Sequence, residues 1–310
     1  LETEILRLHP EKKARIESLA RAKDAMVRIS RLKAELGLDA FIPWVRATFG
    51  PKSPAFDSFH RELVALPFRH VLTTNYDPVL DEAHNGLWKS GKSELVQAAA
   101  QFIDWSNLDD VRELFESLHD AKYSRRYVHL HGRYNAHNTL ILTNDEYQAR
   151  YRDDERNRRL LEGLFGNFRI VTVGFGFADL ELLRIFGALK EALGRGRPLH
   201  FGLLALGDPN DLRDVAVERE RLRDKYGIEP VFYPWTADHG ELATLVHSLL
   251  TKSVDAPSES VAPVKGRKVK AGSAKPALPA VLPLLLSQMD DSRPKPARMA
   301  ELLAVANVAL

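Results

Sequence analysis

The chain of 310 residues contains no cysteine. Disulfide bonds and cysteine-based zinc sites are therefore excluded, and the composition fits a reducing compartment. The chain also lacks any run of about 20 apolar residues, and nothing near its start has the order of a signal peptide. We therefore expect a cytoplasmic protein that does not contact a membrane.

The sequence also has no large excess of positive or negative residues. The 44 Lys and Arg residues nearly balance the 42 Asp and Glu residues, which leaves a formal net charge of +2. A surface that is strongly basic over the whole molecule is excluded, so we do not expect the main domain to bind nucleic acid directly. The first residue is Leu1 and not Met, from which we expect that residues upstream are missing.

Patterns typical of strands and helices alternate over residues 1–250, which we expect to form one domain. Strands are expected at residues 69–74, 127–131, 139–142, 169–174, 199–206 and 229–233. Helices are expected at residues 10–37, 59–65, 145–165, 179–189, 209–226 and 238–250. This alternation predicts an α/β, Rossmann-like fold, in which helices cover both faces of a mostly parallel sheet. Residues 87–122 look mostly helical and predict a small helical insertion.

The composition changes after Thr251. Residues 251–277 are rich in Ser, Pro, Ala and Lys and predict a basic, flexible linker. A solvated tether explains these lysines, and contact with nucleic acid or an acidic partner is the alternative. Residues 278–310 predict two short helices, at residues 278–289 and 296–310. They would form a C-terminal helical tail that docks on a partner or on the main domain.

Two predicted strands end in polar residues. The first segment is Val71-Leu72-Thr73-Thr74-Asn75-Tyr76-Asp77, and the second is Tyr127-Val128-His129-Leu130-His131-Gly132. Ligands of parallel sheets bind beyond the carboxyl ends of the strands, where Asn75, His131 and Gly174 are all expected. A carboxamide donates to a sugar hydroxyl while accepting from water, and an imidazole accepts protons near neutral pH.

A third segment runs Val171-Thr172-Val173-Gly174-Phe175-Gly176-Phe177-Ala178-Asp179. Glycine permits a nucleotide to approach the backbone, and the start of the following helix favours phosphate or ribose oxygens. Taken alone, the two glycines are equally typical of a tight turn. Asp179 is expected to cap the helix rather than to contact a ligand.

Purely structural roles are the alternatives for the other polar residues. Asn75 with Asp77 and Pro78 is typical of an Asx turn at the end of a strand. A histidine at the position of His131 can also be a buried residue whose ring is hydrogen-bonded to a backbone carbonyl. His129, which we expect two residues deeper on the same face of the strand, suits that role better. Asp77 either contacts a ribose or braces the loop.

Together these segments resemble the sirtuin-like (silent-information-regulator-type) NAD-hydrolase domains of bacterial antiphage defence systems. Residues 142–147 and 201–204 are similar to the family too, so the resemblance covers about residues 40–250. It implies that Asn75 and His131 are catalytic. It also implies that NAD+ is the substrate, that no metal is used, and that the substrate-binding residues are Thr74, Asp77, Gly174, Phe175 and Gly176.

The resemblance implies an NAD+ glycohydrolase that forms nicotinamide and ADP-ribose in abortive infection. The alternatives are a non-catalytic scaffold subunit of a defence complex and, more weakly, an NAD-dependent protein deacylase. Deacylating sirtuins generally carry a four-cysteine zinc ribbon, which this chain cannot build. The implied partners are further copies of the chain, and a HerA-type ring ATPase or an Argonaute-type protein.

One family element is not found. The family normally begins with a strand and a Gly-Ala-Gly-x-Ser loop that holds the dinucleotide pyrophosphate, and no such loop occurs in this sequence. Residues 1–50 resemble what usually follows the loop. Either the first strand and the loop are missing from this chain, which the start at Leu1 favours, or the chain is a degraded homologue that holds NAD+ weakly.

Overall fold

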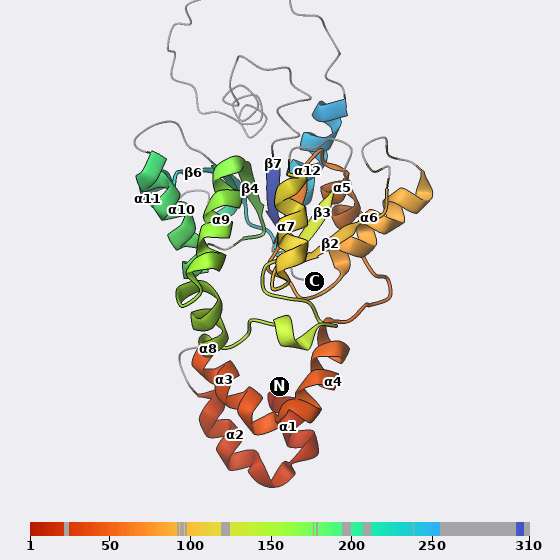
Figure 1. The fold of residues 1–310 in the computed structure, drawn as a ribbon, viewed down its shortest axis with the longest axis vertical. Coiled ribbons are helices and arrows are strands. Elements are labelled where there is room, and N and C mark those ends of the chain that lie inside the picture. The colour runs from red at the N-terminus through yellow and green to blue at the C-terminus, as the bar shows by residue number, and fades with distance from the viewer. Residues whose placement is uncertain are drawn as a thin grey trace, which may run out of the picture.

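The computed structural model describes residues 1–21, 25–91, 93, 96, 98–118, 125–175, 177, 179–193, 200–206, 212–237, 239–254 and 302–306. Its centre is one seven-stranded sheet in which all neighbouring strands are parallel, in the order β2-β3-β1-β7-β4-β5-β6 (Figure 1). The strands are β1 (His70–Thr73), β2 (Gln101–Asp104), β3 (Arg126–His129), β4 (Arg169–Val173), β5 (His200–Leu206), β6 (Ile228–Pro234) and β7 (Leu302–Ala306).

Helices cover both faces of this sheet, so the expected α/β, Rossmann-like fold is confirmed. One face packs against α5 (Ser58–Ala65), α6 (Val79–Ser90) and α12 (Gly240–Val254). The other face packs against α7 (Leu108–Glu116), α9 (Glu155–Asn167), α10 (Leu180–Leu193) and α11 (Leu212–Tyr226). Within the described residues, no helix is long and apolar enough to cross a membrane.

Strands β1, β3 and β4 supply both faces because successive side chains of a strand point in opposite directions. In β1, Leu72 belongs to the core under α9 and α10, whereas Val71 belongs to the core under α5 and α6. In β3, Val128 and Tyr127 divide between the two cores in the same way. Continuous apolar strands of this kind are typical of parallel sheets that are buried on both sides.

The middle strand of the sheet, β7, follows all the others in sequence. Val71 of β1 and Val171 of β4 both pair with Ala304, so β7 joins two halves of three strands each. The helix predicted at residues 296–310 is therefore wrong at residues 302–306. A short apolar run is compatible with either structure, and only its pairing with two strands decides the outcome. The predicted helix at residues 278–289, and residues 255–277 of the predicted linker, lie outside the described residues.

Other local expectations differ from the structure. The region of residues 87–122 is not wholly helical, because the edge strand β2 lies between α6 and α7 and pairs with β3. Residues 139–142 form no strand: a turn of 3-10 helix, η2 (His137–Thr139), is followed by irregular chain. The helix expected at residues 145–165 is divided into α8 (Asn144–Tyr147), the π-helical segment η3 (Gln148–Arg152) and α9.

The first fifty residues form a helical lobe at one end of the sheet (Figure 1). The single helix expected at residues 10–37 is wrong there, because the lobe consists of α1 (Glu2–Leu8), η1 (Pro10–Lys12), α2 (Lys13–Ala20), α3 (Ala25–Leu36) and α4 (Leu38–Phe49). Its apolar core includes Phe41 and Val45 together with Leu140 and Leu142, which follow β3. The lobe is thereby packed against the segment that leaves the carboxyl end of the sheet.

A capping box strengthens this junction. Thr143 accepts a hydrogen bond from the backbone of Glu146, whose own carboxylate accepts from the backbone of Thr143. The same carboxylate pairs with Lys33 of α3. The cap of α8 therefore also connects the helical lobe to the sheet domain.

Candidate functional site

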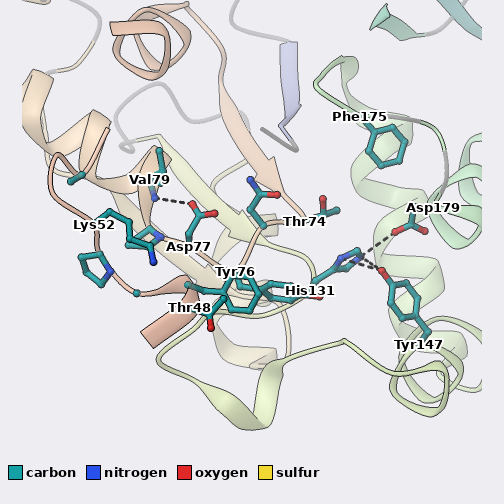
Figure 2. A pocket seen from close by; sticks show the side chains of 16 residues that line it. Thr48, Lys52, Thr74, Tyr76, Asp77, Val79, His131, Tyr147, Phe175 and Asp179 are labelled. Atoms are coloured by element: carbon teal, nitrogen blue, oxygen red, sulfur yellow. Dashed lines mark hydrogen bonds and ion pairs between the residues drawn. The ribbon is translucent and has the colours of Figure 1, made fainter. Parts of the chain in front are cut away.

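A cavity of about 680 Å³ lies at the carboxyl ends of β1 and β4, beside the turn that follows β3 (Figure 2). The end of α4 and the loop after it supply another wall. The cavity is lined by Thr48, Phe49, Gly50, Pro51, Lys52, Ala55, Thr74, Asn75, Tyr76, Asp77, Pro78, Val79, His131, Tyr147, Phe175 and Asp179.

The structure brings most of the predicted site residues together. Those that line the cavity are Thr74, Asn75, Asp77, His131 and Phe175. Gly174 immediately precedes Phe175 and does not itself line the cavity, and Gly176 lies outside the described residues. Among the described residues of the turn after β4, Phe175 contributes an aromatic ring to the cavity.

The segment after β1 is both a turn and a wall of the cavity. The backbone N–H of Asn75 donates to Oγ1 of Thr73 at 3.1 Å, and that of Val79 donates to Oδ1 of Asp77 at 3.1 Å. Asp77 therefore braces the start of α6, and burial raises the pKa of its carboxyl group. Oγ1 of Thr74 is buried and has no hydrogen-bond partner among the described residues. A ligand hydroxyl in the cavity would satisfy this atom.

Tyr76 fixes the floor of the cavity. Its hydroxyl donates to the carbonyl oxygen of Ile141 at 2.6 Å, and its ring lies 5.1 Å from that of Phe49 in α4. Burial raises the pKa of Tyr76, so the phenol stays neutral and serves as a donor. This contact holds the end of β1 against the helical lobe.

His131 lies in an aromatic and acidic environment (Figure 2). Nε2 of His131 is 3.2 Å from Oδ2 of Asp179, and their side chains are 6% and 10% exposed. The hydroxyl of Tyr147 is 3.3 Å from Nδ1 and 3.4 Å from Nε2, and the ring of Tyr151 packs edge-on against the imidazole. Burial, followed by the charge of Asp179, raises the pKa of both phenols, so Asp179 supplies the negative charge beside this histidine.

Asp179 has two sets of partners. Its Oδ1 accepts from the backbone N–H groups of Glu181 and Leu182, both at 3.0 Å, which confirms the predicted helix cap. Burial by itself would raise the pKa of Asp179, but His131 and the two amides outweigh that effect and lower it. The proximity to His131 was missed, since the two residues are far apart in sequence and only the fold brings them together.

Two glycines shape the turns that carry these groups. Gly132 has φ 86° and Gly174 has φ 65°, in the region that side chains disfavour. A Cβ atom at Gly132 would also overlap the carbonyl of Thr139. The chain can therefore turn immediately after His131 only with glycine at position 132.

His129 has the structural role that the sequence suggested. Its Nδ1 lies 3.1 Å from the carbonyl oxygen of Asn75 and its Nε2 lies 3.3 Å from Oδ2 of Asp81, whose carboxylate also pairs with Arg133 at 2.8 Å. The expectation that His129 and His131 share a face is not met. Strand β3 ends at His129, so the alternation of side chains stops there and the two imidazoles contact different helices.

Two further contributors to the cavity were not predicted. The wall of residues 48–52 carried no recognisable motif apart from Gly50-Pro51, and it brings the ammonium group of Lys52 to the rim. Tyr147 was part of a segment similar to the family, but its side chain had no assigned role. In the described parts of the chain, no group of three or more His, Asp or Glu residues is arranged to hold a metal ion.

Comparison with known proteins agrees with this geometry. A family model described as a SIR2-like domain matches residues 69–231, which is more than half of the chain. The match begins at β1 and includes Asn75, His131 and Asp179. No curated protein matches the chain.

Proposed function

The chain belongs to the SIR2-like domain family, and from that premise we propose that it hydrolyses NAD+ at the bond between nicotinamide and ribose. The observation that carries the proposal is the convergence of Asn75 and His131 on one cavity at the carboxyl edge of a parallel sheet. A carboxamide and an imidazole that face the same space are suited to orient a sugar and to accept a proton.

The cavity suits a nucleotide in size and chemistry. Its volume of about 680 Å³ is within the usual range for small-molecule sites, about 300–1,000 Å³. The unpartnered hydroxyl of Thr74 offers a hydrogen bond to a sugar, and Phe175 offers an apolar surface to a planar base. On the opposite wall, Lys52 offers a positive charge to a phosphate, in a chain without the Gly-Ala-Gly-x-Ser loop.

NAD+ contributes a good leaving group, because nicotinamide departs as a neutral base while positive charge develops on the sugar. The protein must supply orientation and a proton acceptor. Asn75 donates its amide N–H to a ribose hydroxyl and accepts from the attacking water. His131 takes a proton from that water as its oxygen bonds to the sugar carbon and the carbon–nitrogen bond breaks. The products are nicotinamide, ADP-ribose and a proton.

Alanine variants of the full-length chain test this proposal. Asn75→Ala and His131→Ala should each lower the rate of NAD+ loss by about 10²–10⁴-fold, the usual contribution of a positioned acid–base group. Asn138→Ala and His247→Ala are matched controls, because both residues are exposed and neither lines the cavity. Nicotinamide release measured by chromatography distinguishes hydrolysis from unspecific loss of NAD+.

Two other results would contradict the proposed hydrolysis and favour a different function. Binding of NAD+ without cleavage, unchanged in the assembled complex, would favour the scaffold interpretation. Removal of the acetyl group from an acetylated peptide in the presence of NAD+ would favour a deacylase. We expect neither result.

We further propose that the activity serves antiviral defence by depleting NAD+ after infection. An unregulated NAD+ hydrolase would harm its own cell, so we expect it to stay inactive until a partner, oligomerisation or a ligand rearranges the site. Candidate regulators are further copies of the chain, a ring ATPase of the HerA type or an Argonaute-type protein. Light scattering gives the oligomeric state. A phage challenge of cells that carry the wild type or His131→Ala tests the role, since only the wild type should protect.

A further inference from the structure

The side chain of Asp179 performs two separable tasks with its two oxygen atoms. Oδ1 accepts both hydrogen bonds from the first turn of α10, from Glu181 and Leu182. Oδ2 is buried, lies 3.2 Å from Nε2 of His131, and makes no well-aligned hydrogen bond within the described residues. The helix cap therefore fixes the carboxylate in place and leaves one of its oxygens directed to the imidazole.

The other groups around His131 bring no competing charge to this position. Tyr147 of α8, Tyr151 of η3 and Tyr76 after β1 are neutral phenols, because burial raises the pKa of each. Glu181 of α10 pairs with two arginines, Arg152 at 2.8 Å and Arg184 at 2.7 Å.

Two further charged residues line the same cavity. Asp77 accepts from the backbone of Val79, and Lys52 donates to the carbonyl oxygen of Ala47 at 3.3 Å. These contacts direct both side chains to their own segments, whereas Oδ2 of Asp179 lies 3.2 Å from Nε2 of His131. Asp179 thus stands out among the charged residues around the imidazole as its direct partner.

We propose that Asp179 is a positioning residue that selects the tautomer of His131 carrying its proton on Nε2. The inference rests on the proposed function, in which His131 accepts a proton, and it identifies Nδ1 as the accepting atom. If Nε2–H donates to Oδ2, 3.2 Å away, the lone pair is on Nδ1. The hydroxyl of Tyr147 lies 3.3 Å from Nδ1 and 3.4 Å from Nε2, so it can donate to whichever nitrogen carries the lone pair. A neutral imidazole has one donor and one acceptor nitrogen, and the bond made by one nitrogen decides the role of the other.

Asp179→Asn separates the two tasks. Asparagine caps helices as well as aspartate does, so its Oδ1 still accepts from Glu181 and Leu182. Its NH2 group replaces Oδ2 and presents a donor to Nε2, which moves the proton of His131 to Nδ1. Serine proteases provide the precedent, because the same exchange beside their catalytic histidine imposes the wrong tautomer and lowers kcat by about 10⁴-fold. Here we expect a loss of about 10²–10⁴ in kcat with KM nearly unchanged.

The decisive measurement is nitrogen-15 NMR of the imidazole, with the His131 signals assigned by their loss in His131→Gln. The wild type should show the Nε2–H form and Asp179→Asn the Nδ1–H form. Asp154→Asn is the matched control, because Asp154 caps α9 through the backbone of Asn157 and does not line the cavity. It should change neither the tautomer nor kcat.

The possible outcomes separate the inference from the proposed function. A change of tautomer in Asp179→Asn supports the inference even if the wild type does not cleave NAD+, which would overturn the proposed function alone. An unchanged tautomer in a protein whose NAD+ cleavage depends on His131 overturns the inference alone. An unchanged tautomer with a lower melting temperature shows that Asp179 is only a helix cap, and also overturns it.

Discussion

His129 and His131 are two residues apart, and each lies within 3.3 Å of a carboxylate, but their surroundings differ. The His129–Asp81 pair is 1% and 2% exposed, and Arg133 neutralises its carboxylate. The other nitrogen of His129 contacts the Asn75 carbonyl. The His131–Asp179 pair has no third, cationic partner in the described chain, and it faces a cavity.

The difference teaches that a histidine beside a carboxylate is not by itself a functional site. In the first pair the protein itself supplies a partner for the polar groups. The pair therefore has a structural role, which is to fix the backbone of Asn75. In the second pair the other imidazole nitrogen lies near the hydroxyl of Tyr147, which lines the same cavity as His131. The two cases differ in whether a third residue compensates the charge of the carboxylate, and in whether the pair has access to a cavity.

The largest effect that we predict from this comparison is on the free energy of unfolding. Asp81→Ala leaves the buried His129 and the partly buried Arg133 without their partner, which should lower the free energy of unfolding by about 3–5 kcal/mol. Asp179→Ala removes a helix cap and should cost only about 0.5–2 kcal/mol. Urea denaturation of both variants measures the difference. Equal losses would show that the two pairs are energetically alike.

A smaller effect is expected from the phenols around His131. Tyr147→Phe removes the hydroxyl near Nδ1, and since a hydrogen bond is worth about 0.5–1.5 kcal/mol, kcat should fall by about 2–12-fold. Tyr151→Phe is the control, because the hydroxyl of Tyr151 donates to the carbonyl oxygen of Leu130. It should lower stability and leave kcat unchanged. A larger loss of kcat in Tyr151→Phe than in Tyr147→Phe would show that the hydroxyl of Tyr151, and not that of Tyr147, assists His131.

The smallest effect concerns pH. Although burial opposes it, contact with His131 and two amides lowers the pKa of Asp179 in the folded state. A depressed carboxyl pKa contributes stability above the unfolded value of about 3.9, and this is lost as the pH falls through the folded pKa. The advantage of the wild type over Asp179→Asn should therefore be constant near neutral pH and vanish in acid. Thermal unfolding from pH 3 to pH 7 tests this, and an advantage that grows in acid would contradict it.

Much of the fold could be predicted because local signals were strong. The run before Asn75 is apolar and ends in polar residues, so β1 and its functional end were recognisable together. Thr143 with Glu146, and Asp179 before an apolar helix, carry capping chemistry that depends on a few neighbouring residues. Such features can be predicted from the sequence because they need no partner that is distant in the chain.

The remaining features depend on distant partners. Gln101–Asp104 is too short to distinguish a strand from a helix, and its pairing with β3 decides the matter. The role of Asp179 beside His131 requires β3 and β4 to end at the same edge. The wall of residues 48–52 required the helical lobe to pack on Leu140 and Leu142.

The position of β7 has a consequence for how this protein is made. The two halves of the sheet cannot be joined until residues 302–306 have been synthesised, because the strand between them comes last. Until then, the inner edges of β1 and β4 expose unpaired backbone groups, which invite pairing with other chains. After Val254, synthesis of the stretch up to Ala306 takes roughly 3–10 s at about 5–20 residues per second. For that interval, pairing of an inner edge with a strand of another chain competes with completion of the sheet.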